Sequence, residues 1–358
     1  MEELELLVVH DRLEEILLAE KHVLDNKLLS DPLDVYREMH PSLRDIWYSP
    51  GIEFKCLLDR NVVSYLVSLA NGLDISKQKN QDPYRSVAAL QTVLNAGKIL
   101  SETGYAYHEY MERNSLTKAD DELALFRAAD NLDPNIYLDL FLKQRDCINS
   151  NELLSFNTGE LVKGDLPERL TLVERNAVIV KKAISIARTK DISPYQTMLE
   201  LMDWVYDEYM FSMPSFQFLS VYFSSWKVSK MIKSHGYQDL RNATWDISFV
   251  QQLIKCCRED NESIWLFSSF DKAIHTVVDL TFVKREEDES LYMERIEKAY
   301  ASMWGKKNGY GKKLLKKMLK ISENSNDPER KINLFNGSAE YQLDLRARVH
   351  KEYEEALS

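Results

Sequence analysis

The run Phe54–Val63 constrains the fold of this chain more than any other segment. An apolar stretch short enough for a buried strand ends in Asp59, and Asn61 is followed by an apolar run that reads as a helix. In open α/β sheets, ligands bind beyond the carboxyl ends of the strands. Asp59 is therefore a candidate metal ligand. The same position also suits a helix N-cap or a turn, so the segment alone leaves both interpretations open.

Other acidic residues stand at comparable places further along the chain. The strand-like run Ser263–Phe270 ends in Asp271, and Asp246 lies near the start of the helix expected before that strand. Glu109 belongs to a segment that we expect to begin a helix. The β-branched run 275–283 fits either a helix or a strand, because short apolar runs do not decide between them.

Composition restricts the class of protein. The chain of 358 residues has a net charge of -11, which argues against a positive coat for nonspecific nucleic-acid binding but not against a local basic face. No apolar stretch approaches the roughly 18 residues of a membrane span, and the acidic N-terminus has the wrong sign for a signal peptide. The four cysteines lack C-x-x-C spacing, so we expect a reduced, cytoplasmic protein without membrane contact.

Several common catalytic motifs are absent. The sequence contains no Walker loop, no G-x-G-x-x-G, no G-x-S-x-G, no H-x-x-x-H pair and no Cys/His group with zinc spacing. This removes the simplest interpretations of nucleotide binding, zinc chemistry and serine hydrolysis. A Ser-His-Asp set assembled from distant positions is not excluded by the absence of these motifs.

The periodicity divides the chain into five ranges. We expect an N-terminal helical segment at 1–50, and two halves of an α/β domain at 51–113 and 236–297. An all-helical insertion at 114–235 would separate the halves and offer a surface to a protein partner or regulator. The range 298–358 would form a basic and then polar helical extension.

The order of these features resembles the PIN-like (PilT N-terminal-like) nucleases. The resemblance covers about 53–113 and 236–285, and the long helical insertion departs from the family pattern. It implies a helix-rich α/β fold with a parallel sheet flanked by helices, and the site is matched, in chain order, by Asp59, Asn61, Glu109, Asp246, Ser268 or Ser269, and Asp271.

The resemblance also implies an activity. Asp59, Asp246 and Asp271 would bind Mg²⁺ or Mn²⁺, and Glu109 would bind metal or orient the attacking water; Glu112 is the alternative to Glu109. Asn61 and the two serines would support the ligands. Hard oxygen ligands suit these ions, which would relieve repulsion among crowded carboxylates and activate water for phosphodiester hydrolysis. The expected activity is a metal-dependent endoribonuclease acting on RNA, or on DNA, as a toxin, antiviral defence effector or RNA-processing enzyme.

A block of lysines is the second candidate site. Residues 298–320 contain eight lysines and no acidic residue, and the predicted nucleic-acid contacts are Lys306, Lys307, Lys312, Lys313, Lys316 and Lys317. The alternative is a solvated helix face that offsets neighbouring acids. For the whole chain, the alternatives are a noncatalytic helical interaction or regulatory protein, and a degenerate nuclease fold that only binds nucleic acid.

Overall fold

The computed structural model describes residues 12–33, 42–47, 49, 51–153, 166–190, 192–224, 237–305, 309–325, 327–335 and 339–358. The chain forms two compact units. The first, here called the sheet unit, comprises Met1–Leu166 and Gln252–Lys272. The second, here called the helical unit, comprises Pro167–Gln251 and Ala273–Ser358.

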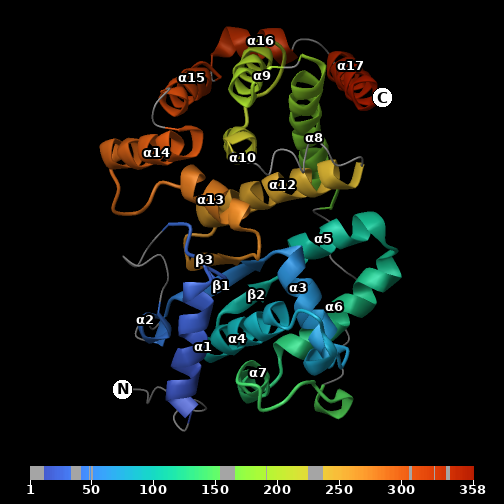
Figure 1. The fold of residues 1–358 in the computed structure, drawn as a ribbon, viewed down its shortest axis with the longest axis vertical. Coiled ribbons are helices and arrows are strands. Elements are labelled where there is room, and N and C mark those ends of the chain that lie inside the picture. Colours follow the sequence, from blue (N-terminus) through green and yellow to red (C-terminus); the bar gives the residue numbers. More distant parts are fainter. Residues whose placement is uncertain are drawn as a thin grey trace. The chain divides into compact units, whose positions relative to one another are not determined.

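The sheet unit is built on three parallel strands (Figure 1). They are β1 (Glu53–Leu58), β2 (Leu100–Glu102) and β3 (Ser263–Ser268), in the order β2-β1-β3. The chain thus leaves β1 toward one neighbour first and returns on its other side much later. In open α/β sheets, ligands bind beyond the carboxyl ends of the strands, at the point where the strand order reverses in this way.

Helices supply the rest of the sheet unit. Its elements, besides the strands, are α1 (Leu13–Asp25), α2 (Leu43–Trp47), α3 (Arg60–Ala70), η2 (Ile75–Lys77), α4 (Asp82–Ala96), α5 (Gly104–Arg113), α6 (Leu116–Asp130), α7 (Pro134–Phe141) and η3 (Ser150–Glu152). Helix α4 is buried along most of its length and packs against α1, α3 and α7, while α3 also packs against α5 and α6. The apolar core of this unit therefore lies around α4 and the central strand.

Every described secondary-structure element of the helical unit is a helix. Its elements are α8 (Leu166–Thr189), α9 (Pro194–Glu208), α10 (Met213–Ser224), the first part of α12 (Tyr237–Glu259), α13 (Lys272–Thr281), α14 (Glu289–Trp304), α15 (Tyr310–Asn324), α16 (Pro328–Phe335) and α17 (Ala339–Leu357). Helix α15 packs so closely on α14 that a Cβ at Gly311 would collide with the carbonyl group of Tyr300.

The two clear strand predictions are confirmed, and so is a helix-rich α/β fold with a parallel sheet. The run 275–283, left open by its periodicity, is helical as far as Thr281. The short strand β2, which follows the end of α4 at Ala96, was not predicted.

The division into units differs from the five expected ranges. Helices α6 and α7, which fall in the expected insertion 114–235, belong to the sheet unit because they pack on α3 and α4. The range 298–358, expected as a separate extension, forms one unit with 167–251 because α15 packs on α9. The boundaries follow tertiary packing, which the periodicity of single helices does not report.

Within the described part of the chain, no helix is both long enough and apolar enough to cross a membrane.

Candidate functional site at the carboxyl edge of the sheet

Asp59 directly follows the central strand and is buried, with 7% of its surface exposed. It is the N-cap of α3, and its Oδ1 accepts a hydrogen bond from the backbone N–H of Arg60 at 2.7 Å. Its Oδ2 accepts from Asn61 Nδ2 and from Ser269 Oγ, each at 2.6 Å. The capping interpretation is thus correct, yet the carboxylate is also the centre of a polar network.

This network joins the ends of two strands that are 210 positions apart in the chain. Ser269 Oγ accepts from the backbone N–H of Asp271 at 3.0 Å while it donates to Asp59. Asn61 Oδ1 accepts from the backbone N–H of Phe270 at 3.2 Å. Ser269 and Asn61 therefore fix the loop after β3 against the loop after β1, which brings Asp271 near Asp59.

The charge of Asp59 interacts with two further carboxylates, Glu109 and Asp271, and we call these three residues the acidic cluster. Burial, with a smaller contribution from the charge of Asp271, raises the pKa of Asp59 to about 6 against the lowering effect of its hydrogen bonds. Burial, followed by the charge of Asp59, raises the pKa of Glu109 to about 7, partly offset by Arg113 and Arg60. Buried carboxylates with raised pKa values are typical of functional sites.

The remaining predicted residues have different surroundings. Ser268 is fully buried, and its hydroxyl has no hydrogen-bond partner in the described part of the chain, whereas its carbonyl accepts from the N–H of Asp59 at 3.0 Å. Ser269, rather than Ser268, thus supports the cluster through its side chain. Burial and the charge of Asp59 raise the pKa of Glu109 in α5, and the choice between Glu109 and Glu112 stays a prediction.

Asp246 lies well inside α12, in the part of that helix that belongs to the helical unit. The expectation that it stands near the start of its helix is therefore wrong. Asp59, Glu109 and Asp271 all belong to the sheet unit. The acidic cluster is thus described within one unit, and the role of Asp246 stays a prediction.

The donor atoms of the acidic cluster fit a hard divalent cation. Within the described ranges, one hydrogen bond reaches Oδ1 of Asp59, from the backbone N–H of Arg60, and this oxygen has a second lone pair. Among the described residues, no three His, Cys, Asp or Glu side chains lie close enough together to hold a metal ion. Mg²⁺ needs no such cage, because it usually keeps several waters and takes only one or two carboxylates.

One further residue of this edge, Arg60, was not predicted as part of the site. Arg60 Nη1 lies 2.5 Å from Glu122 Oε1 of α6, and its guanidinium carbon lies 4.2 Å from the centre of the Tyr110 ring of α5. Glu122 and Tyr110 therefore hold this guanidinium beside the acidic cluster. No sequence pattern could indicate this arrangement, because the three residues come from separate helices.

The predicted lysines of the helical unit differ in exposure. Lys306 and Lys307 lie outside the described residues. Lys317 is engaged, because its Nζ lies 2.6 Å from Asp203 Oδ1 and donates to the carbonyl of Leu199 at 3.2 Å. Lys312 is exposed and lies 3.6 Å from Glu297. A third group is exposed without an ion pair in the described part of α15, namely Lys313, Lys316 and Lys320.

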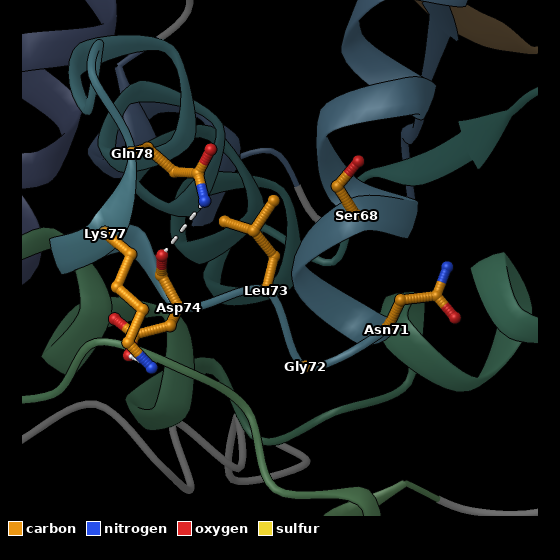
Figure 2. A pocket seen from close by; sticks show the side chains of 7 residues that line it. All are labelled: Ser68, Asn71, Gly72, Leu73, Asp74, Lys77 and Gln78. Carbon is orange, nitrogen blue, oxygen red and sulfur yellow. Dashed lines mark hydrogen bonds and ion pairs between the residues drawn. The ribbon is translucent and has the colours of Figure 1, made fainter.

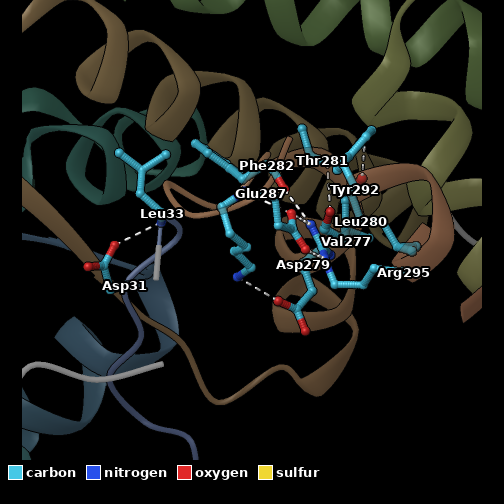
Figure 3. A network of polar contacts seen from close by, with 11 residues as sticks. Asp31, Leu33, Val277, Asp279, Leu280, Thr281, Phe282, Glu287, Tyr292 and Arg295 are labelled. Atoms are coloured by element: carbon cyan, nitrogen blue, oxygen red, sulfur yellow. Dashed lines mark hydrogen bonds and ion pairs between the residues drawn. The ribbon is translucent and has the colours of Figure 1, made fainter. Parts of the chain in front are cut away.

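Two further polar regions have structural explanations. Figure 2 shows a shallow depression near Leu73 and Gln78, at the end of α3 opposite to Asp59; Asp74 there caps η2 and pairs with Lys77 at 3.0 Å. Figure 3 shows Arg295 in the helical unit, paired with Glu287 at 2.5 Å and bound to the carbonyl of Phe282 at 2.8 Å. The arginine satisfies a carbonyl just beyond α13 that would otherwise lack a helical partner.

Comparison with protein-family models, curated proteins and solved structures finds no match to this chain. The geometry of the acidic cluster and the sequence pattern are therefore the basis for inferring its function.

Proposed function

We propose that this protein is a metal-dependent nuclease that hydrolyses phosphodiester bonds of RNA, or of DNA, at the acidic cluster. One observation carries the proposal: carboxylates from the end of β1, from α5 and from the end of β3 interact at the carboxyl edge of a parallel sheet, where the strand order reverses. This is the location at which open α/β sheets bind ligands. The order of the residues is the one that resembles PIN-like nucleases, and roles as a toxin or antiviral effector rest on that resemblance alone.

Each residue of the site would have a distinct role in hydrolysis. Asp59 and Asp271 would hold Mg²⁺ or Mn²⁺, which when bound lowers the pKa of water and neutralises charge on the phosphate. Glu109 would accept the proton of the attacking water through its carboxylate, since a pKa near 7 suits a general base. Asn61 and Ser269 would keep the Asp59 carboxylate oriented by their hydrogen bonds.

Cleavage assays on labelled single-stranded RNA, tRNA, single-stranded DNA and plasmid DNA, with Mg²⁺, Mn²⁺ or EDTA, test the proposal. We expect cleavage that needs metal and falls at least roughly 100-fold in Asp59→Asn, Asp271→Asn and Glu109→Gln. Asp133→Asn is the matched control, because Asp133 is an exposed carboxylate that also caps a helix, α7. Its activity should be unchanged.

Binding of metal gives a second readout that does not depend on turnover. Because a ligand of the folded state stabilises it by mass action, Mn²⁺ should raise the Tm of the parent protein and of Asp133→Asn, but not that of Asp59→Asn. Absence of cleavage on every substrate together with no metal-dependent shift would contradict the proposal. Binding of RNA without cleavage would instead favour a degenerate nuclease fold.

A further inference from the structure

Arg60 is a cation that lies beside the acidic cluster. Its backbone N–H donates to the Asp59 carboxylate, and its positive charge lowers the pKa of Glu109. The side chain is mostly buried, with 17% of its surface exposed. Both the main chain and the side chain of Arg60 therefore lie beside the predicted reaction centre.

The way in which Arg60 is held leaves donors available. Among the described residues, Glu122 accepts a hydrogen bond from Nη1 alone, and the ring of Tyr110 faces the guanidinium. Nε and Nη2 make no hydrogen bond to any described residue, and neither nitrogen is fully buried. Three of the five N–H donors of a guanidinium thus remain open to solvent.

This arrangement differs from that of arginines with purely structural roles in the same unit. Both terminal nitrogens of Arg85 donate, Nη1 to the carbonyls of Leu140 and Arg145 and Nη2 to Asp146, although its Nε has no partner among the described residues. Arg145 binds both carboxylate oxygens of Glu152. A guanidinium that is fixed in place yet keeps a fork of free donors matches the geometry of a phosphate group. Its ordering entropy has already been lost in the folded protein, so little further is lost on binding.

We propose that Arg60 binds a backbone phosphate of the nucleic-acid substrate through Nε and Nη2, and that Glu122 and Tyr110 hold the guanidinium for this purpose. The inference rests on the proposed nuclease function and adds a phosphate-binding residue to it. Binding and cleavage are measured separately, so that the two proposals fail in different ways.

The test uses the full chain and a fluorescein-labelled single-stranded RNA of mixed sequence. In EDTA, fluorescence anisotropy should show that Arg60→Gln binds roughly 10- to 100-fold more weakly, as expected when a charge-assisted hydrogen bond is removed. The slope of log affinity against log salt should become shallower by about 0.7, because one phosphate fewer is neutralised. Arg60→Lys keeps the charge but not the planar pair of donors, so its RNA affinity should lie between those of the parent and Arg60→Gln.

Two companion variants separate binding from folding. Glu122→Gln removes the anion but keeps Arg60, so its RNA affinity should equal or exceed that of the parent. The double variant Arg60→Gln/Glu122→Gln leaves no unpaired charge, so it should regain the melting temperature while binding stays weak. With Mn²⁺ present, Arg60→Gln should raise KM more than it lowers kcat, as expected when a ground-state interaction is removed.

Each outcome points to one explanation. Equal affinity and equal salt slope for Arg60→Gln and the parent would overturn the inference and leave the nuclease proposal intact. The inference also fails if Glu122→Gln weakens binding as much as Arg60→Gln and the double variant restores it, because Arg60 would then act only through the fold. A parent protein that neither binds nor cleaves RNA or DNA would overturn both proposals.

Discussion

At the scale of single residues, Asp59 shows that one side chain can serve folding and chemistry together. It caps α3, as a residue after a strand often does, but two side-chain donors also converge on its Oδ2. Sequence alone located Asp59 and Asp271 because each follows an apolar run. It could not locate Arg60, whose significance depends on Glu122 and Tyr110 from other helices.

The raised pKa of Asp59 predicts an unusual pH dependence of stability. The ordinary pKa of Asp is near 3.8 and the folded value is about 6, so between these values the folded state binds more protons than the unfolded state. The free energy of unfolding should therefore fall as pH rises through this window, by up to about 1–3 kcal/mol. Asp59→Asn lacks the titrating carboxyl group, so its free energy of unfolding should not fall in this way. The free energy of unfolding of Asp59→Asn minus that of the parent should therefore increase with pH.

Urea unfolding of both proteins at about pH 4.5 and about pH 8, without metal, measures this difference. Asp133→Asn reports the ordinary cost of losing a cap carboxylate. A stability difference between Asp59→Asn and the parent that does not change with pH would mean that burial does not destabilise the Asp59 carboxylate.

At the scale of elements, a strand or helix could be predicted from the sequence only where its own residues show a clear pattern. β1 and β3 were predictable, because each is a short apolar run that ends in a polar residue. β2 was not, since it has three residues and half-exposed Leu100 on a sheet edge, where burial produces little pattern. The run 275–283 stayed undecided because its β-branched residues favour strands, whereas α13 buries Ile274, Val277 and Val278 at helical spacing.

Helix α15 has an unbalanced charge pattern that predicts binding of a polyanion. It buries Leu314, Leu315 and Met318 and exposes lysines, of which Lys312, Lys316 and Lys320 repel one another at i,i+4 spacing. We expect the triple variant Lys313→Gln/Lys316→Gln/Lys320→Gln to bind single-stranded RNA more weakly at low salt. Its salt slope should be shallower by about 0.7 for each phosphate that is no longer neutralised.

The control for this prediction removes the same charge elsewhere. Lys21, Lys190 and Lys351 are exposed lysines of other helices or helix ends that already pair with acidic residues. Replacing these three by Gln changes the net charge equally and should leave affinity nearly unchanged. If both triple variants lose affinity to the same extent, α15 is only a solvated helix face.

At the scale of the whole molecule, each unit is discontinuous in sequence. The chain passes between the units at 166–167, inside α12 at 251–252, and at 272–273 near the start of α13. Local periodicity identified many of the helices but not their unit, because α6 and α7 have the same kind of amphipathic pattern as the helices of the other unit. Only their contacts with α3 and α4 assign them to the sheet unit.

This division raises the question of whether one unit or both supply the ligands of the site. The resemblance assigns Asp246 the third acidic position, whereas the acidic cluster of Asp59, Glu109 and Asp271 lies within the sheet unit. If Asp246 binds metal, Asp246→Asn should lower the rate of cleavage at least roughly 100-fold, as Asp59→Asn does, and should weaken the Mn²⁺-dependent rise in Tm.

Asp279→Asn is the matched control, since Asp279 is a carboxylate of the same unit that pairs with Lys284 at 2.9 Å. A loss below about threefold in Asp246→Asn, equal to that of the control, would confine the metal ligands to the sheet unit. This result would be compatible with Mg²⁺ binding, because waters can complete the coordination of the ion when only one or two carboxylates are present. A large loss would instead support Asp246 as a metal ligand.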